Sequence, residues 1–506
     1  MATLLVSLSV AAEPTSTTTT GTTPNPNQAA LTGRRIAVDT PVEAFTPSPT
    51  AATISPTIYL ERCKGGCVVN GGSLNDARTM TSTIPNPGQY NVSEFKNAAG
   101  QIGTAADAEW NMFVTCMREV YSPYMVTVTD VKPASGVSYH LALVAGTPPE
   151  VGLDNGILGV APLASNCGAF DNVISFSFAN AHSQTDPLDR TLNLCWTAAQ
   201  ESAHAFGLDH EYAFLSDNRS ACNDPMTYRT DCGGQKFFRN EAASCGEFDG
   251  PRQCRCGASQ NSHLKILSVF GAGTPITGVP TVAVTTPPAS STGANTLPAN
   301  VIAQASDKRG IAKVELYLNG YKWAEAKGAP FGANGQPDSA YGLLVPSTVP
   351  DSVYDVMARA YDDLGAYTDS AVITVTKGAE GGCTSASSCL TGQKCEAGKC
   401  FWDAPTGQLG DACTYPQFCV SGQCSNSTFA GDGVCTQTCV PGMADSCPAD
   451  SGLSCVATGQ PGQGLCVPAD EGGGCCSTSD TTTPWPQIGM AGFVLGLVVL
   501  RRRRRG

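Results

Sequence analysis

One short segment, QESAHAFGLDH, begins at Gln200 and holds side chains suited to chemistry. Gln200 and His204 are four residues apart, so in a helix they share one face and can reach a common ion. Glu201 is the neighbour placed to polarise a water on that ion. Gly207 suits a sharp helix end because it adopts positive φ, and the chain can then return His210 to the same point. The spacing predicts a metal site with an adjacent general base.

The segment resembles the zinc signature of the metzincin metalloproteases, H-E-x-x-H-x-x-G-x-x-H, except that Gln200 replaces the first histidine. The resemblance implies that His204 and His210 are zinc ligands and that Glu201 is the general base. A chance match within a polar amphipathic helix is the alternative.

A second motif, DPMTY, lies downstream and resembles the Met-turn of the same family. The resemblance implies that Met226 forms a hydrophobic floor beneath the metal, although Met226 can equally be ordinary core. Tyr228 stands where some members place a tyrosine near the metal.

The third zinc ligand is left open by Gln200, because a carboxamide oxygen is a poorer zinc ligand than imidazole. His182 is a candidate, since it follows the last predicted strand and precedes the helix. Tyr228 and Asp209 offer oxygen atoms, but Asp209 is expected to be a solvated loop carboxylate. Surface exposure or ordinary hydrogen bonding is expected for the histidines outside the motif: His140, His182 and His263.

The elements that must position this motif form a predicted α+β head domain, residues 56–271. Helical periodicity predicts helices over residues 107–122 and 187–206. Strands are predicted at residues 57–63, 124–131, 138–146 and 172–180.

A β-sandwich is predicted over residues 278–377, where short alternating apolar runs replace the helical pattern. Asn319-Gly320 is a dipeptide that a type I′ hairpin turn requires. This region resembles a bacterial immunoglobulin-like domain. A stalk is its expected role, and specific ligand binding is the alternative.

Twelve cysteines lie between residues 383 and 468, with almost no apolar periodicity. Disulfides are expected to replace a hydrophobic core there, in diverged repeats of a small knot. A zinc ribbon is the alternative.

The N-terminal residues divide into two predicted parts. Residues 1–12 read as a signal peptide without a basic n-region, or as a frayed apolar terminus. The Pro- and Thr-rich residues 13–55 are expected to be a low-complexity linker.

The C-terminal residues begin with a predicted linker, 469–483, that holds Cys475 and Cys476. A short apolar run and five arginines follow in residues 484–506. This order resembles the myxobacterial C-terminal sorting segment, which implies membrane retention of a precursor and processing near the cysteines by sorting machinery. A simple transmembrane tail anchor with a structural disulfide is the alternative.

The composition limits the partners. A formal net charge of −13 disfavours nucleic acid, because an acidic surface repels phosphates. The 24 cysteines favour an oxidising compartment and therefore export. Together these features predict a zinc endopeptidase that is anchored at the cell surface and acts on extracellular protein or peptide. The alternative is a non-catalytic surface binding or adhesion protein that uses the same fold as a scaffold.

Overall fold

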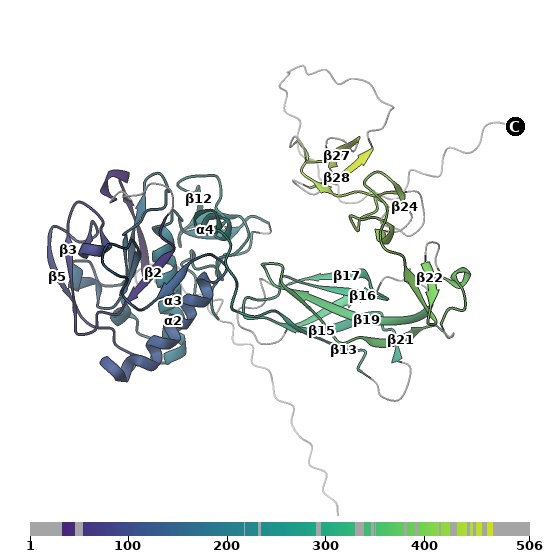
Figure 1. The fold of residues 1–506 in the computed structure, drawn as a ribbon, viewed down its shortest axis with the longest axis horizontal. Coiled ribbons are helices and arrows are strands. Elements are labelled where there is room, and N and C mark those ends of the chain that lie inside the picture. The colour runs from purple at the N-terminus through teal and green to yellow at the C-terminus, as the bar shows by residue number, and fades with distance from the viewer. Residues whose placement is uncertain are drawn as a thin grey trace, which may run out of the picture. The chain divides into compact units, whose positions relative to one another are not determined.

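The computed structural model describes two stretches of the chain, residues 33–45 and 54–468. The second stretch has internal gaps at residues 217, 231–233, 290–294, 329–338, 346–348, 350, 379–381, 390–392, 414–415, 426–432, 443–445, 449–451 and 458–462. The predicted signal peptide, the C-terminal sorting segment, Cys475 and Cys476 lie outside the described residues. The described chain is a multidomain, mostly β protein with few helices (Figure 1).

The head domain is built on a six-stranded mixed sheet in the order β1-β8-β9-β7-β2-β6. Its strands are β1 (Arg34–Thr40), β2 (Thr57–Glu61), β6 (Thr127–Thr129), β7 (His140–Val144), β8 (Ile157–Ala164) and β9 (Ile174–Ser177). Its helices are α2 (Asp107–Tyr121), α3 (Pro187–His204) and α4 (Ser262–Phe270). The predicted helices and strands are confirmed, whereas β1 and β8 fall in segments for which no strand was expected.

Smaller elements complete this domain. Two three-stranded sheets have the orders β4-β3-β5 and β10-β11-β12. Their strands are β3 (Cys67–Gly71), β4 (Thr81–Ser82), β5 (Gly88–Val92), β10 (Glu211–Phe214), β11 (Ala243–Gly246) and β12 (Pro251–Arg252). Short 3-10 helices lie at Val42–Ala44, Ala77–Thr79, Gly103–Ala106, Pro148–Val151 and Ala179–Ala181.

The linker prediction for residues 13–55 is wrong for residues 34–45. Arg34–Thr40 form β1, which pairs in parallel with β8. Ile36 and Val38 pack against the core, so this run carries the alternation of a strand. The strand was not predicted because the surrounding sequence is rich in Pro and Thr. Its hydrogen-bonding partner, β8, also lies more than a hundred residues away in the sequence.

The two faces of the sheet have different covers. Helices α2 and α3 contact each other and pack on one face, where Ala142 and Val144 of β7 join the larger core (Figure 1). Leu141 and Leu143 point to the opposite face, into a second core with Val69 of β3. Strand β7 is therefore buried on both sides, as expected for a central strand.

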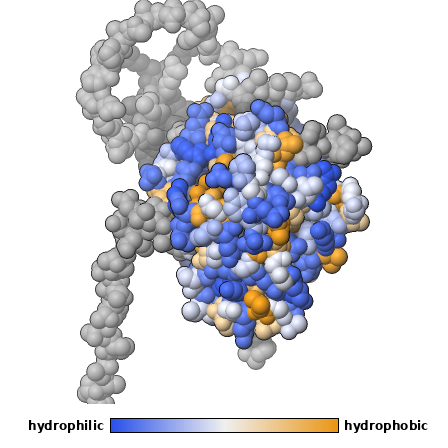
Figure 2. Space-filling view, turned by 90° about the vertical axis from the view of Figure 1, so that its left-hand side faces the viewer, coloured by the Kyte–Doolittle hydropathy of each residue, from blue (hydrophilic) through white to orange (hydrophobic). Residues whose placement is uncertain are grey.

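The outer face of the head domain is mainly polar. Figure 2 shows hydrophobic residues scattered among hydrophilic ones on this face, with no single large patch. Such a surface suits contact with water rather than a permanent apolar interface.

The immunoglobulin-like region forms two sheets around one core. One sheet has the order β13-β15-β18, and the other the order β14-β21-β19-β16-β17, with β20 paired to β19. The strands are β13 (Thr281–Thr286), β14 (Asn295–Thr296), β15 (Asn300–Ser306), β16 (Lys313–Leu318), β17 (Tyr321–Lys327), β18 (Ser339–Leu344), β19 (Ser352–Tyr361), β20 (Tyr367–Asp369) and β21 (Ile373–Lys377). Asn319 and Gly320 both have positive φ between β16 and β17, which confirms the predicted hairpin turn.

The cysteine-rich region carries six disulfides and no zinc ribbon among its described residues. In each of three consecutive groups of four cysteines, the first pairs with the third and the second with the fourth. The pairs are Cys383–Cys395, Cys389–Cys400, Cys413–Cys424, Cys419–Cys435, Cys439–Cys455 and Cys447–Cys466. The shared pairing confirms the expectation of repeated disulfide-stabilised modules.

Short strands accompany these disulfides. They are β22 (Gln393–Glu396), β23 (Lys399–Trp402), β24 (Ala412–Cys413), β25 (Gly433–Val434), β26 (Thr438–Cys439), β27 (Leu453–Ala457) and β28 (Gly464–Pro468). Within the described part of the chain, no helix has the length and apolar character needed to cross a membrane.

The disulfide Cys116–Cys195 joins α2 to α3 across a sequence separation of 79 residues, whereas Cys63 and Cys67 are separated by only 4 residues. Replacing both members of the long-range pair by Ala is expected to lower the free energy of unfolding by about 4 kcal/mol. The same change in the short-range pair is expected to lower it by about 2 kcal/mol, because a disulfide that closes a longer loop removes more entropy from the unfolded chain. Denaturant unfolding followed by tryptophan fluorescence measures both values. Equal losses in the two variants contradict this loop-length account.

Candidate metal and catalytic site

Helix α3 carries the candidate residues at its buried C-terminal end. Asp186 caps its start by accepting hydrogen bonds from the amides of Leu188 and Asp189. The last turn holds four polar side chains that are completely buried: Gln200, Glu201, Ser202 and His204. Burial of so many polar groups on one helix end is unusual for an ordinary core-facing stripe, which makes this end a candidate site.

Gly207 reverses the chain after the helix, as predicted. Its φ is +87°, and a Cβ atom at this position would lie 2.0 Å from the carbonyl oxygen of Cys167. The amide of Leu208 returns to the carbonyl of Ala203 at 3.2 Å. The reversal brings His210 back to His204.

The two histidines meet through their Nε2 atoms, which are 3.0 Å apart. The Nδ1 atom of His204 lies 2.7 Å from the carbonyl oxygen of Leu208, which can only accept, so this nitrogen carries the proton. The Nδ1 atom of His210 lies 3.0 Å from Oε1 of Glu247 and donates in the same way. Each neutral ring therefore directs an Nε2 lone pair toward the other.

Neither histidine takes up a proton near pH 7 that would turn this contact between the two Nε2 atoms into a hydrogen bond. Burial and the nearby His210 lower the pKa of His204 to about 3. Burial also lowers the pKa of His210, although Glu247 opposes that shift. Both rings are neutral near pH 7, and two facing lone pairs are stabilised by a bound cation.

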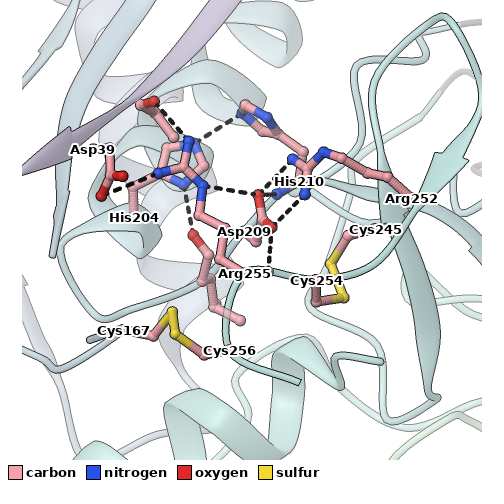
Figure 3. Close-up of polar contacts among 12 residues, drawn as sticks. Asp39, Cys167, His204, Asp209, His210, Cys245, Arg252, Cys254, Arg255 and Cys256 are labelled. Carbon is pink, nitrogen blue, oxygen red and sulfur yellow. Dashed lines mark hydrogen bonds and ion pairs between the residues drawn. A yellow bond between two sulfur atoms is a disulfide. The ribbon is translucent and has the colours of Figure 1, made fainter. Parts of the chain in front are cut away.

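A cluster of charges supports His210 from outside. Arg252 binds Asp209 at 2.6 Å (Figure 3) and also binds Glu247 at 2.5 Å. Burial alone would raise the pKa of each carboxylate, but these hydrogen bonds hold the pKa of both at about 2. Glu247 therefore stays ionised and fixes the tautomer of His210, as carboxylates commonly do for metal-binding histidines.

Asp209 corrects the expectation of a solvated carboxylate. Its side chain is buried and accepts hydrogen bonds from the amides of His210 and Arg255 as well as from Arg252. The partner arginines lie more than forty residues downstream, beyond the reach of a local pattern. Asp209 thus holds the reversed loop in place.

The side chain of Gln200 is held by the DPMTY segment. Its Nε2 donates to the carbonyl oxygen of Met226 at 3.2 Å, and Met226 is fully buried in the larger core. The Oε1 atom of Gln200 is buried and has no hydrogen-bond partner among the described residues. A free buried oxygen one turn before His204 is available to a cation.

Glu201 points toward the sheet. A Cβ atom at Gly159 of β8 would lie 2.5 Å from its Oε1, so only glycine leaves room for this carboxyl group. Both carboxyl oxygens are buried and lack a hydrogen-bond partner in the described part of the chain. Burial raises the pKa of Glu201 well above its ordinary value, and the charge of Arg35 opposes this shift.

Tyr228 lies beside the histidine pair. Its ring centroid is 4.6 Å from that of His210, and its hydroxyl donates to the backbone oxygen of Arg35. Burial and the nearby Glu201 raise its pKa. Tyr228 is therefore a neutral hydrogen-bond donor at the site.

The remaining histidines have separate environments. Nε2 of His140 is 3.0 Å from Oγ of Ser175, and Nδ1 of His263 is 3.0 Å from the hydroxyl of Tyr124. His182 is buried, and its ring nitrogens have no hydrogen-bond partner within the described residues. Burial, with Arg190 and Arg35, lowers the pKa of His182 to about 3.

Further groups of potential metal ligands occur in the described chain. Asp209, His210 and Glu247 place one ligand atom each within 4.8 Å of one another. Arg252 forms ion pairs with both of these carboxylates. Three other groups consist of cysteines, and another joins Glu61 to Cys63 and Cys67; all of these cysteines form the disulfides given above.

Three site residues were missed by sequence reasoning: Gly159, Glu247 and Arg35. Gly159 and Arg35 lie in the two unexpected strands, and Glu247 follows β11 without a motif around it. Their proximity to α3 arises from tertiary pairing. The alternation of residues 34–40 is the one local signal that pointed to a strand.

Comparison with known proteins identifies one region. The bacterial Ig domain family matches residues 280–363, in agreement with the β-sandwich. A solved structure of Clostridium thermocellum CbhA fibronectin(III)-like modules is 19% identical, covers 20% of this chain and 48% of that chain, and has a TM-score of 0.15. This chain thus spans about half the length of that structure. No curated protein matches the chain. The Ig domain and the disulfides indicate an extracellular protein.

Replacing Gly207 by Ala tests the reversal. The new methyl group would meet the Cys167 carbonyl in a left-handed backbone, so the free energy of unfolding is expected to fall by about 3 kcal/mol. Gly136→Ala is the matched control: its φ is +85° but nothing lies within 4 Å, and a loss of about 1 kcal/mol is expected. Chemical denaturation of both variants measures the difference, and similar losses exclude the close contact.

Proposed function

We propose that the head domain is a metzincin-like, zinc-dependent endopeptidase that acts on extracellular proteins or peptides. The observation that carries the proposal is the pair of buried, neutral imidazoles with Nε2 atoms 3.0 Å apart and both Nδ1 protons engaged elsewhere. Zinc binds neutral imidazole readily. A carboxylate that accepts a hydrogen bond from the other ring nitrogen of a zinc-binding histidine, as Glu247 does for His210, is typical of zinc sites.

The residues present fit such an ion. His204 and His210 would hold it through Nε2, and the free Oε1 of Gln200 would be a weaker third ligand. The Met-turn residue Met226 supports Gln200 through its carbonyl oxygen.

The chemistry divides between the ion and the chain. A bound zinc supplies Lewis acidity, which favours ionisation of water and polarises a peptide carbonyl. Glu201 is the group that would take a proton from water and pass it to the leaving amine. Its burial, without a hydrogen-bond partner among the described residues, leaves its oxygens free for this transfer. Tyr228 lies at the same site, where its neutral hydroxyl donates to the backbone oxygen of Arg35.

A non-catalytic surface binding or adhesion protein is the second candidate, and Gln200 favours it. A neutral amide oxygen contributes less to zinc affinity than an imidazole, so a weakly held ion would leave a scaffold without hydrolysis. In both cases the proposal includes a stalk role for the Ig-like domain and surface anchoring through the C-terminal segment.

Zinc content separates these cases. The purified, oxidised full chain is expected to hold one zinc per molecule by elemental analysis, and His204→Ala is expected to lose it. His263→Ala is the matched control, because its Nδ1 faces Tyr124 and it should retain zinc. Gln200→His is expected to raise zinc affinity by about tenfold or more, since imidazole replaces an amide oxygen. A zinc content that does not respond to His204→Ala rejects the site.

Hydrolysis of casein tests the role of Glu201. Glu201→Gln is expected to keep zinc but to lower the rate by about 100-fold or more, because the proton acceptor is lost. Asp154→Asn, which changes an exposed carboxylate of the same domain, should leave the rate unchanged. Strand β1 covers the edge of β8 beside Glu201. The assay therefore compares the intact chain with a chain from which residues 1–45 have been detached at an inserted cleavage site. Activity that survives Glu201→Gln contradicts the mechanism.

A further inference from the structure

Strand β1 occupies the outer edge of β8. The two strands pair in parallel, with Arg35 opposite Gly159 and Thr40 opposite Ala164. The other edge of β8 is taken by β9. An open strand edge is the surface to which an extended peptide adds through main-chain hydrogen bonds, so β1 fills a peptide-binding position.

The far side of β1 is also held, by residues around the candidate site. The hydroxyl of Tyr228 donates to the backbone oxygen of Arg35, and Nη2 of Arg35 donates to the backbone oxygen of Tyr228 at 2.8 Å. Arg255 donates to the backbone oxygen of Ala37 at 3.2 Å and lies 3.5 Å from Asp39 (Figure 3). Several of these contacts use the main chain of β1, which is how a groove binds peptides of varied sequence.

The strand passes directly beside the candidate catalytic group. Glu201 packs against Gly159, which is the residue paired with Arg35. Tyr228 contacts both Arg35 and the ring of His210. The Arg35 side chain is buried, with a relative exposure of 3%. Any peptide that reached Glu201 along β8 would have to take the place of β1.

We propose that residues 34–40 are an internal pseudosubstrate strand that closes the candidate site, with Arg35 as its anchor, and that their departure opens the edge of β8 to an extended peptide. This inference rests on the proposed function for its consequence, but the occupancy of the groove can be tested separately. Arg34 lies on the same strand with an exposed side chain, so it provides a matched control for Arg35.

The test uses the full chain with a specific protease site inserted between residues 46 and 53, cut and stripped of its first segment. A fluorescent synthetic peptide of residues 33–45 is expected to bind the stripped chain and not the intact one. The Arg35→Ala peptide should bind about tenfold more weakly or worse, because a hydrogen bond from a charged donor is lost, and the Arg34→Ala peptide within about twofold. Equal weakening by the two substitutions, or equal binding by intact chain, overturns the proposal.

A second measurement applies if the stripped chain unfolds. In the intact chain, Arg35→Ala is expected to speed amide hydrogen exchange in residues 34–40 by about tenfold or more, and Arg34→Ala is expected to leave it unchanged. Identical exchange in the two variants overturns the anchor role.

Hydrolysis distinguishes this proposal from the proposed function. A stripped chain that binds the peptide but cleaves no casein supports the pseudosubstrate strand and rejects the endopeptidase. Casein cleavage at equal rates by intact and stripped chains, without peptide binding, rejects the strand proposal alone.

Discussion

The chain reversal at Gly207 is the constraint on which the candidate site depends. Helix α3 can supply Gln200, Glu201 and His204, but His210 reaches them only because the backbone turns back beneath the Cys167 carbonyl. That carbonyl also accepts a hydrogen bond from Lys265 at 2.9 Å, and the disulfide Cys167–Cys256 joins it to a loop. One turn is thus fixed by a close backbone contact, a disulfide and a positive φ. The position of His210 relative to His204 depends on that turn.

Buried charges then determine the state of the histidines. Asp209, which is buried, and Glu247, which is partly buried, share Arg252, and this contact helps to keep both carboxylates ionised. Breaking such a group by removing one partner leaves an unpaired buried charge, which is strongly destabilising. The same cluster fixes the Nδ1 proton of His210 and leaves its Nε2 free. One network of charged side chains therefore both stabilises the loop and leaves the Nε2 atom of His210 unprotonated.

Local spacing accounts for the parts of this site that the sequence predicted. The positions 200, 201 and 204 depend only on helical periodicity, and the positive φ of Gly207 only on its lack of a side chain. The Asn319-Gly320 turn was predictable for the same reason. Asp209, Glu247 and the strand β1 depend on partners distant in sequence, and composition averaged over residues 13–55 hid the strand altogether. Sequence thus predicted the helix end and placed the candidate ligands on it, whereas the neighbours that set charge and access required the fold.

The unpaired polar atoms around α3 argue for function over stability. A buried donor or acceptor without a partner costs about 1–3 kcal/mol, and a well-packed apolar side chain would avoid that cost. Among the residues that the structure describes, Glu201 and His182 each bury two such atoms, and Gln200 buries one. A helix end selected for packing alone would carry apolar residues at these positions, as α3 does at Ala198 and Ala203. This cost arises where three independent features meet: the histidine pair, the space left by Gly159, and the edge of β8 that β1 covers. A site that binds an ion and an extended chain explains all three at once, and a structural helix explains none of them.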